Sequence, residues 1–162
     1  MSDTIANTQL ISAIKNAWKY KYPYDKIDDA LRNNADINWC SNEIGIDGQT
    51  PLLMAIDKYD NNEELYKDIC KKLIKLKADV NKTSYEVLTP LMLAVECGAS
   101  TIMELLLENG ADINTQDKYG QTALLRAIRN RMDDQVKLLL EYGADVTIVD
   151  KYGKSAITQL KK

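Results

Sequence analysis

The pattern of apolar and polar positions recurs along this chain with a nearly constant period. Three strings align with one another, namely TPLLMAI at Thr50 to Ile56, TPLMLAV at Thr89 to Val95 and TALLRAI at Thr122 to Ile128. Their first threonines lie 39 and 33 residues apart. A second string, of the form ADIN, ADVN or ADVT, begins at Ala35, Ala78, Ala111 and Ala144, with steps of 43, 33 and 33. Because two independent strings share one period, the chain is predicted to be a stack of structural repeats.

One period predicts two short antiparallel helices followed by a loop. Thr89 and Pro90 favour a helix start, since the hydroxyl can cap free amides and proline has no amide to leave unpaired. A second helix that is buried on more than one side is predicted by the apolar residues Ile102, Met103, Leu105, Leu106 and Leu107. That helix is expected to end at Asn109 and Gly110. The polar stretch from Asp112 to Gln121 then has the composition of a hairpin loop.

The chain resembles the ankyrin repeat family, whose period is 33 residues and whose marker is T-P-L-H-x-A. The resemblance extends from Thr8 to Leu160 and implies an all-α solenoid of stacked helix-turn-helix units with hairpin loops. It implies four repeats and a short C-terminal capping unit in one domain, residues 1–162. The marker histidine is replaced by Leu53, Met92 and Leu125, and the proline becomes Ala123 and Ala156. The hairpin glycine, present as Gly48, Gly120 and Gly153, becomes Val87, which puts that hairpin's geometry in question.

The repeat boundaries are expected at Met1 to Asn38, Trp39 to Asn81, Lys82 to Asn114, Thr115 to Thr147 and Ile148 to Lys162. The last unit has room for one helix, and its lysines suit a polar cap. The step from Ala35 to Ala78 is longer than the other steps. This extra length predicts an extended hairpin from Trp39 to Gly48 and an extended helix pair around Asp57 to Glu64. Lys19 to Pro23 is the expected turn of the first unit.

Charge and composition narrow the class of partner. The chain has 24 acidic and 21 basic residues and a formal net charge of -3, so no broad positive field favours nucleic acid. Neither a signal-peptide pattern nor a membrane-spanning apolar run is present, so no membrane partner is expected. No disulfide framework is expected, because the three cysteines are an odd number and are not closely spaced. We expect the protein to be cytoplasmic, or to be delivered into a host cytoplasm. We also expect it to be a monomer when no partner is bound.

Catalytic and metal chemistry are not indicated. The sequence contains no histidine, the commonest general base and metal ligand. Cys40, Cys70 and Cys97 fall at three different places in the repeat register, and no C-x-x-C pair or glycine-rich phosphate loop occurs. We therefore expect no enzyme activity, no cofactor and no metal.

The family resemblance implies that a partner protein lies across the hairpin tips and first helices, which form the concave side. The matching positions in this chain are Tyr85, Glu86, Leu88, Glu96, Cys97, Lys118, Tyr119, Gln121, Arg129, Asn130, Lys151, Tyr152 and Lys154. Tyrosine and arginine are common among residues that dominate binding. Packing of each tyrosine against its neighbouring hairpin is the alternative. Tyr119 and Arg129 are expected to be exposed on the same side of the stack.

Four further features need separate interpretation. For all of them except Trp18, a functional and a structural interpretation are both open. Trp39 is either a partner anchor or a plug beneath its lengthened hairpin, and Trp18 follows Leu10, Ile14 and Ala17 on one helical face, which predicts a core position. The basic stripe Lys67, Lys71 and Lys75 is interpreted as a solvated outer face, with an acidic partner patch as the alternative. Asn114, in LENGADIN, resembles an asparaginyl hydroxylation target, although hydrogen bonding within the turn is the simpler role.

These observations together predict a non-catalytic protein-binding module acting as an adaptor, an inhibitor or a host-directed factor. The alternative is a regulatory or immunity-type subunit whose function appears only beside a cognate enzyme. A neighbouring gene that encodes an enzyme or a toxin would favour that alternative.

Overall fold

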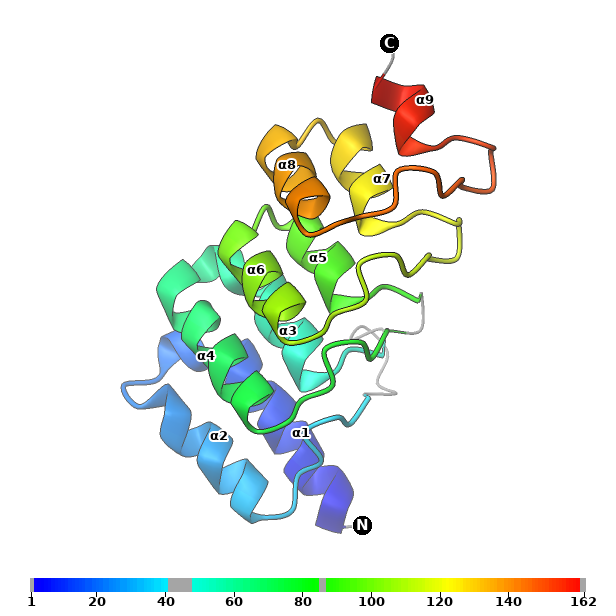
Figure 1. The fold of residues 1–162 in the computed structure, drawn as a ribbon. Coiled ribbons are helices and arrows are strands. Elements are labelled where there is room, and N and C mark those ends of the chain that lie inside the picture. The colour runs from blue at the N-terminus through cyan, green and yellow to red at the C-terminus, as the bar shows by residue number, and fades with distance from the viewer. Residues whose placement is uncertain (1, 41–47, 85–86, 161–162) are drawn as a thin grey trace.

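A computed structural model describes residues 2–40, 48–84 and 87–160, and these residues form helices and connecting loops (Figure 1). The elements in chain order are α1 Ser2–Lys15, the 3-10 helix η1 Ala17–Lys19, α2 Pro23–Arg32, α3 Pro51–Asp57, the 3-10 helix η2 Tyr59–Asn61, α4 Glu63–Lys75, α5 Pro90–Glu96, α6 Ser100–Glu108, α7 Ala123–Arg129, α8 Asp133–Glu141 and α9 Ala156–Leu160. The all-helical class expected from the sequence is confirmed for this part of the chain.

The helices form two layers. The first helices of the units, α1, α3, α5, α7 and α9, each pack on the next one along the chain. The second helices cover them, with α2, α4, α6 and α8 each packed against the first helix of the same unit. Figure 1 shows the two ends of the chain at opposite ends of this stack, and the loops from α6 to α7 and from α8 to α9 projecting on the same side of it. The fold is therefore built from contacts between neighbouring units, as in other repeat proteins.

Threonine caps start three of the first helices. The hydroxyl of Thr50 accepts a hydrogen bond from the Leu53 amide at 3.2 Å, and Thr89 and Thr122 make the same bond at 3.1 and 3.3 Å. Pro51 and Pro90 occupy the first helical turn, where no intrahelical donor is needed. The residues at the marker histidine position, Leu53, Met92 and Leu125, are all buried. Apolar packing therefore replaces a polar side chain there.

One continuous apolar core runs through the stack. Leu52, Leu91 and Leu124 from successive first helices belong to it, together with Ile102 and Leu106 from α6. Leu106 and Leu124 are both 0% exposed, as expected from their recurring apolar positions. Each such side chain is shared between adjacent units, so no repeat buries its apolar face alone.

A series of asparagine side chains accepts backbone amides on the loop side, once within the first unit and then between consecutive units. The side-chain oxygens of Asn7, Asn38, Asn81 and Asn114 accept the backbone amides of Asp36, Asp79, Asp112 and Asp145 at 2.6, 2.7, 2.8 and 2.9 Å. The Asn114 backbone amide in turn donates to the Asp112 carboxylate at 2.9 Å. Asn114 thus has the turn-holding role that the sequence suggested, and it also bridges two units.

The expected core position of Trp18 is wrong. α1 ends at Lys15, and the chain continues as η1, which has about 3.0 residues per turn where an α-helix has about 3.6. The angular register therefore changes, so that Ala17 is buried and Trp18 is 55% exposed. The ammonium group of Lys19 lies 5.1 Å from the centre of the Trp18 ring. Trp18 is a surface residue of the first turn.

The other expected features of the N-terminal half can be followed in the described residues. α2 begins at Pro23, the last residue of the expected turn, and η2 occupies the extension between α3 and α4. Lys71 and Lys75 are exposed on α4 and Lys67 is half-buried, while Ile69 and Leu73 of the same helix are in the core. The tip of the first lengthened hairpin, residues 41–47, lies outside the described residues.

Val87 keeps the geometry of its hairpin. Its φ is 60°, in the left-handed region that glycine normally occupies. The Val87 amide donates to the Ser84 carbonyl at 3.0 Å, as the Gly120 amide donates to Asp117 at 2.9 Å. Ser84 and Val87, the described residues at this turn, therefore keep the backbone bond seen at Gly120, with a β-branched residue in a strained conformation.

Candidate functional site

Two aspartates close the hairpin loops of the C-terminal half. One oxygen of Asp117 accepts the amides of Tyr119 at 2.7 Å and Gln121 at 2.8 Å. Asp150 repeats this arrangement and accepts the amides of Tyr152 at 2.8 Å and Lys154 at 2.9 Å. Each carboxylate therefore fixes the turn that carries a tyrosine at its tip.

The two hairpins are also bonded to each other. The Lys151 amide donates to the Tyr119 carbonyl at 3.0 Å, and the side-chain amide of Gln116 donates to the Val149 carbonyl at 3.0 Å. The backbones approach so closely that a Cβ on Gly120 would lie 3.0 Å from the Lys151 nitrogen. The neighbouring tips therefore form a defined surface and are not independent loops.

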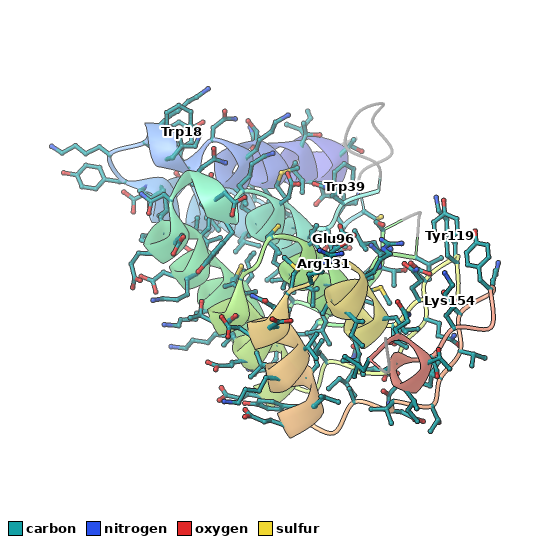
Figure 2. The ribbon with its side chains drawn as sticks, turned by 90° about the horizontal axis from the view of Figure 1, so that it is seen from above. Trp18, Trp39, Glu96, Tyr119, Arg131 and Lys154 are labelled. Carbon is teal, nitrogen blue, oxygen red and sulfur yellow. The ribbon has the colours of Figure 1, made fainter. Side chains whose placement is uncertain are left out.

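The tyrosines at these tips face solvent. Tyr119 is 46% exposed and Tyr152 is 72% exposed. Figure 2 shows Tyr119 and Lys154 at the edge formed by the hairpin loops, far from Trp18 at the other end of the molecule. The exposure favours accessible side chains over burial against the next hairpin, which was the alternative interpretation. Tyr85 and Glu86 lie outside the described residues.

An ion-paired arginine links two units beside these hairpins. The Arg126 guanidinium pairs with Asp117 at 2.5 Å and with the Glu96 carboxylate on α5. Asp117 has a fully buried side chain, and the Arg126 side chain is nearly buried. Glu96, expected as a partner contact, is thus engaged within the molecule, although it remains at the surface.

The environment of Asp117 favours its charged form. Burial raises the pKa of this carboxyl, but the Gln121 amide, the Arg126 guanidinium and the Tyr119 amide together outweigh burial and hold the pKa below its usual value. Asp117 and Arg126 therefore form a charged pair that stabilises the hairpin of the fourth unit at neutral pH.

Gln121 is not a surface residue, which corrects its expected place among the partner contacts. It is 6% exposed. Its amide and carbonyl both bond to Asp117, because this is where the hairpin closes before α7. Leu88, at the same register position in the preceding unit, is half-buried and packs against the core. The remaining described candidates, Lys118, Arg129, Asn130, Lys151 and Lys154, are exposed, and Cys97 is half-buried.

Trp39 is half-buried and packs against the core of the stack. This position favours its interpretation as a plug beneath the lengthened hairpin. Cys40, next to it, donates to the Gly48 carbonyl at 2.7 Å, which holds the two ends of that hairpin together.

A hollow of about 400 Å³ lies where the end of α7, the last hairpin and α9 meet. Its lining includes Arg129, Arg131, Lys154, Thr158 and Gln159. Arg129 and Lys154 were among the expected contacts, so the structure brings these two together. Sequence reasoning missed Arg131, Gln159 and the paired Arg126. Two signals were available, because Arg126 stands where α3 and α5 carry Met54 and Leu93, and Arg131 stands where the preceding unit has Gly98.

The cysteine environments do not favour thiol chemistry. Burial, with smaller contributions from the Asp60, Asp57 and Glu96 carboxylates, raises the pKa of Cys97 to about 11. Burial also raises the pKa of Cys70. A nucleophilic cysteine needs a lowered pKa, so neither residue is activated. Across the described residues, no group of three His, Cys, Asp or Glu is placed to hold a metal ion.

Comparisons with known proteins agree with this architecture. A family model described as ankyrin repeats (3 copies) matches residues 10–117 and 61–150. A search of curated proteins found no match. Among the described helices, none combines the length and apolar character needed to cross a membrane. The repeat period, the threonine caps, the two helical layers and the family match together place the chain in the ankyrin repeat family.

Proposed function

We propose that this protein binds a partner protein through its tip surface, defined as Lys118, Tyr119, Lys151 and Tyr152. Ankyrin repeats are in general protein–protein interaction modules, and the family is typically non-catalytic. The observation that carries the proposal is the pair of exposed tyrosines on two hairpins that are hydrogen-bonded to each other.

This arrangement has the properties of a binding surface. Tyrosine offers a large contact area and a hydroxyl group, and it is enriched among residues that dominate binding energies. Because Asp117 and Asp150 fix the two turns, little conformational entropy is lost when a partner orders the tips. We infer a role as an adaptor or inhibitor in a cytoplasm, and the identity of the partner would distinguish these roles from that of an enzyme's regulatory subunit.

The test begins with capture of partners on the immobilised protein, followed by measurement of the dissociation constant of the most enriched one. A Tyr119→Ala, Tyr152→Ala variant should bind at least about 30-fold more weakly, which corresponds to the 2 kcal/mol typical of one dominant contact. Its melting temperature should be close to that of the wild type, since both side chains are exposed.

Two control variants separate this surface from the rest of the exterior. Trp18→Ala removes an exposed aromatic side chain from the opposite end, and Lys71→Ala removes a cation from the basic stripe. Both should leave the dissociation constant within about twofold. If either control weakens binding while the double tyrosine variant binds normally, the tip surface is not the binding site.

A further inference from the structure

The hollow beside α9 gathers positive charge without a matching carboxylate. Arg129 comes from the end of α7, Arg131 from the following loop and Lys154 from the last hairpin, and all three are exposed. No aspartate or glutamate is among the described residues that line it. Such a concentration is unexpected in a chain whose net charge is -3.

These three cations have no ionic partner within the described part of the chain. Arg126, one helical turn earlier, is held by Glu96 and Asp117, whereas Arg129, Arg131 and Lys154 form no such pair. Asp133 and Asp134 follow in sequence but lie in the first turn of α8, where carboxylates are stabilised by the helix itself. The charges in the hollow are thus available to a ligand.

Arg131 adopts an unfavourable backbone conformation at this place. Its φ is 58°, and the equivalent residue of the preceding unit is Gly98, with a φ of 65°. A residue with a Cβ is strained in this region, whereas glycine is not. Strain of this kind is often retained at functional sites. The position therefore favours a use for the guanidinium group that compensates for the lost stability.

A purely structural account explains only part of the arrangement. Arg129 lies in the last turn of α7, where a cation interacts favourably with the helix dipole. Arg131 and Lys154 lie outside that helix. The Gln159 side chain, half-buried in the same hollow, adds a polar group that a simple solvated surface does not require.

We propose that this basic pocket, defined by Arg129, Arg131 and Lys154, receives an anionic side chain of the partner polypeptide, a carboxylate or a phosphomonoester. The proposal rests on the proposed protein-binding function and specifies one contact within it. Guanidinium groups bind both anions through charge-assisted, often bidentate hydrogen bonds, and arginine clusters recognise acidic and phosphorylated peptides. A nucleic acid would need an extended basic track, whereas these cations occupy one pocket of an acidic protein.

The pocket can be tested without knowing the partner. The ¹⁵N-labelled protein is titrated at constant ionic strength with N-acetyl-phosphoserine N-methylamide, with N-acetyl-glutamate N-methylamide and with the matching serine derivative. The amides of Arg131, Gly153 and Gln159 should show saturable shifts with at least one anion and none with serine. The tighter of the two anions identifies whether phosphate or carboxylate is preferred.

Arg131→Gly gives a sharp test, because it should weaken anion binding while it stabilises the fold. One lost charge-assisted hydrogen bond corresponds to about a tenfold higher dissociation constant. The melting temperature should rise, since glycine relieves the strain. The matched control is Lys77→Gly, which removes an exposed cation with a φ of 71° from a different unit. It should raise the melting temperature but leave the dissociation constant within about twofold.

Three results would overturn the proposal that this pocket binds an anionic side chain. The first is the absence of saturable shifts with both anions, and the second is equal weakening by Arg131→Gly and Lys77→Gly, which would indicate long-range attraction only. The third is tighter binding of a short oligothymidine to the same amides, which would assign the pocket to nucleic acid. Because no partner protein is used, failure here leaves the tyrosine variants as an independent test of the tip surface.

Discussion

The third and fourth units share one fold but differ in the residues of the first helix and of the turn that follows it. On α5 the third unit has the buried Leu93, whereas the fourth has the ion-paired Arg126 at the equivalent position of α7. The residue after the first helix's C-cap is Gly98 in the third unit and the strained Arg131 in the fourth. Charged groups have therefore replaced apolar packing and a relaxed turn in one unit only.

This difference shows how a repeat stack can specialise locally. Each unit contacts only its neighbours, so a change in the fourth unit need not alter the first. The ion pair between Arg126 and Glu96 joins the fourth unit to the third. The hydrogen bond from the Lys151 amide to the Tyr119 carbonyl joins the fourth unit to the last. The specialised region thus consists of the fourth unit and the edges of its two neighbours.

The largest expected loss of stability follows from changes in the apolar core that the two units share. Leu106→Ala on α6 and Leu124→Ala on α7 should each lower the free energy of unfolding by about 2 to 5 kcal/mol, because both side chains are fully buried. Denaturant unfolding followed by circular dichroism measures this loss. A change below about 0.5 kcal/mol, typical of surface sites, would show that the units are aligned wrongly.

The hairpins of the two units should respond in opposite directions to reciprocal changes. Gly120→Ala should cost about 1 to 3 kcal/mol of unfolding free energy, because φ is +76° and the new Cβ would lie 3.0 Å from the Lys151 nitrogen. Val87→Gly should add up to about 1 kcal/mol, since glycine relieves the strain at a φ of 60°. Thermal melts of both variants measure these changes in stability. A loss of stability in Val87→Gly would contradict the strain inferred for the hairpin of the third unit.

A smaller, pH-dependent effect should distinguish the charged fourth unit. The folded pKa of Asp117 is lowered, so its ionised form stabilises the protein above the unfolded pKa of about 4, and this contribution is lost as the pH falls through the folded pKa. Melting temperatures of the wild type and Asp117→Asn should therefore differ most near neutral pH and converge in acid. A difference that stays constant from pH 7 to pH 3 would mean that the charge of Asp117 contributes nothing.

Much of the architecture could be predicted because its signals are local and repeated. The threonine before each first helix, the apolar faces and the loop residues each follow from short-range chemistry, and their recurrence fixed the alignment of the units. Exposure of Tyr119, Tyr152 and Arg129 followed from their register positions. Their role in partner binding stays a prediction.

Two residues show where local reasoning failed. The sequence pattern predicts a core position for Trp18 only if the α-helix is uninterrupted, and the change to η1 after Lys15 leaves the side chain at the surface. The family resemblance implies a surface position for Gln121, whereas closure of the hairpin by Asp117 buries the residue. A change of helix type decided the exposure of Trp18, and hydrogen bonds that close a loop decided the burial of Gln121.

The sequence by itself determined the repeat, the helix starts and the composition of the core, because periodic burial and capping depend on residues close together in the chain. Only the tertiary structure decided that Arg126 pairs with Glu96 30 residues away, or that Arg129, Arg131 and Lys154 line one hollow. The physical reason is that stacking brings together loops from successive units, so contacts between charged side chains depend on the spacing and rotation of the stack. The period of a single chain does not encode those contacts directly.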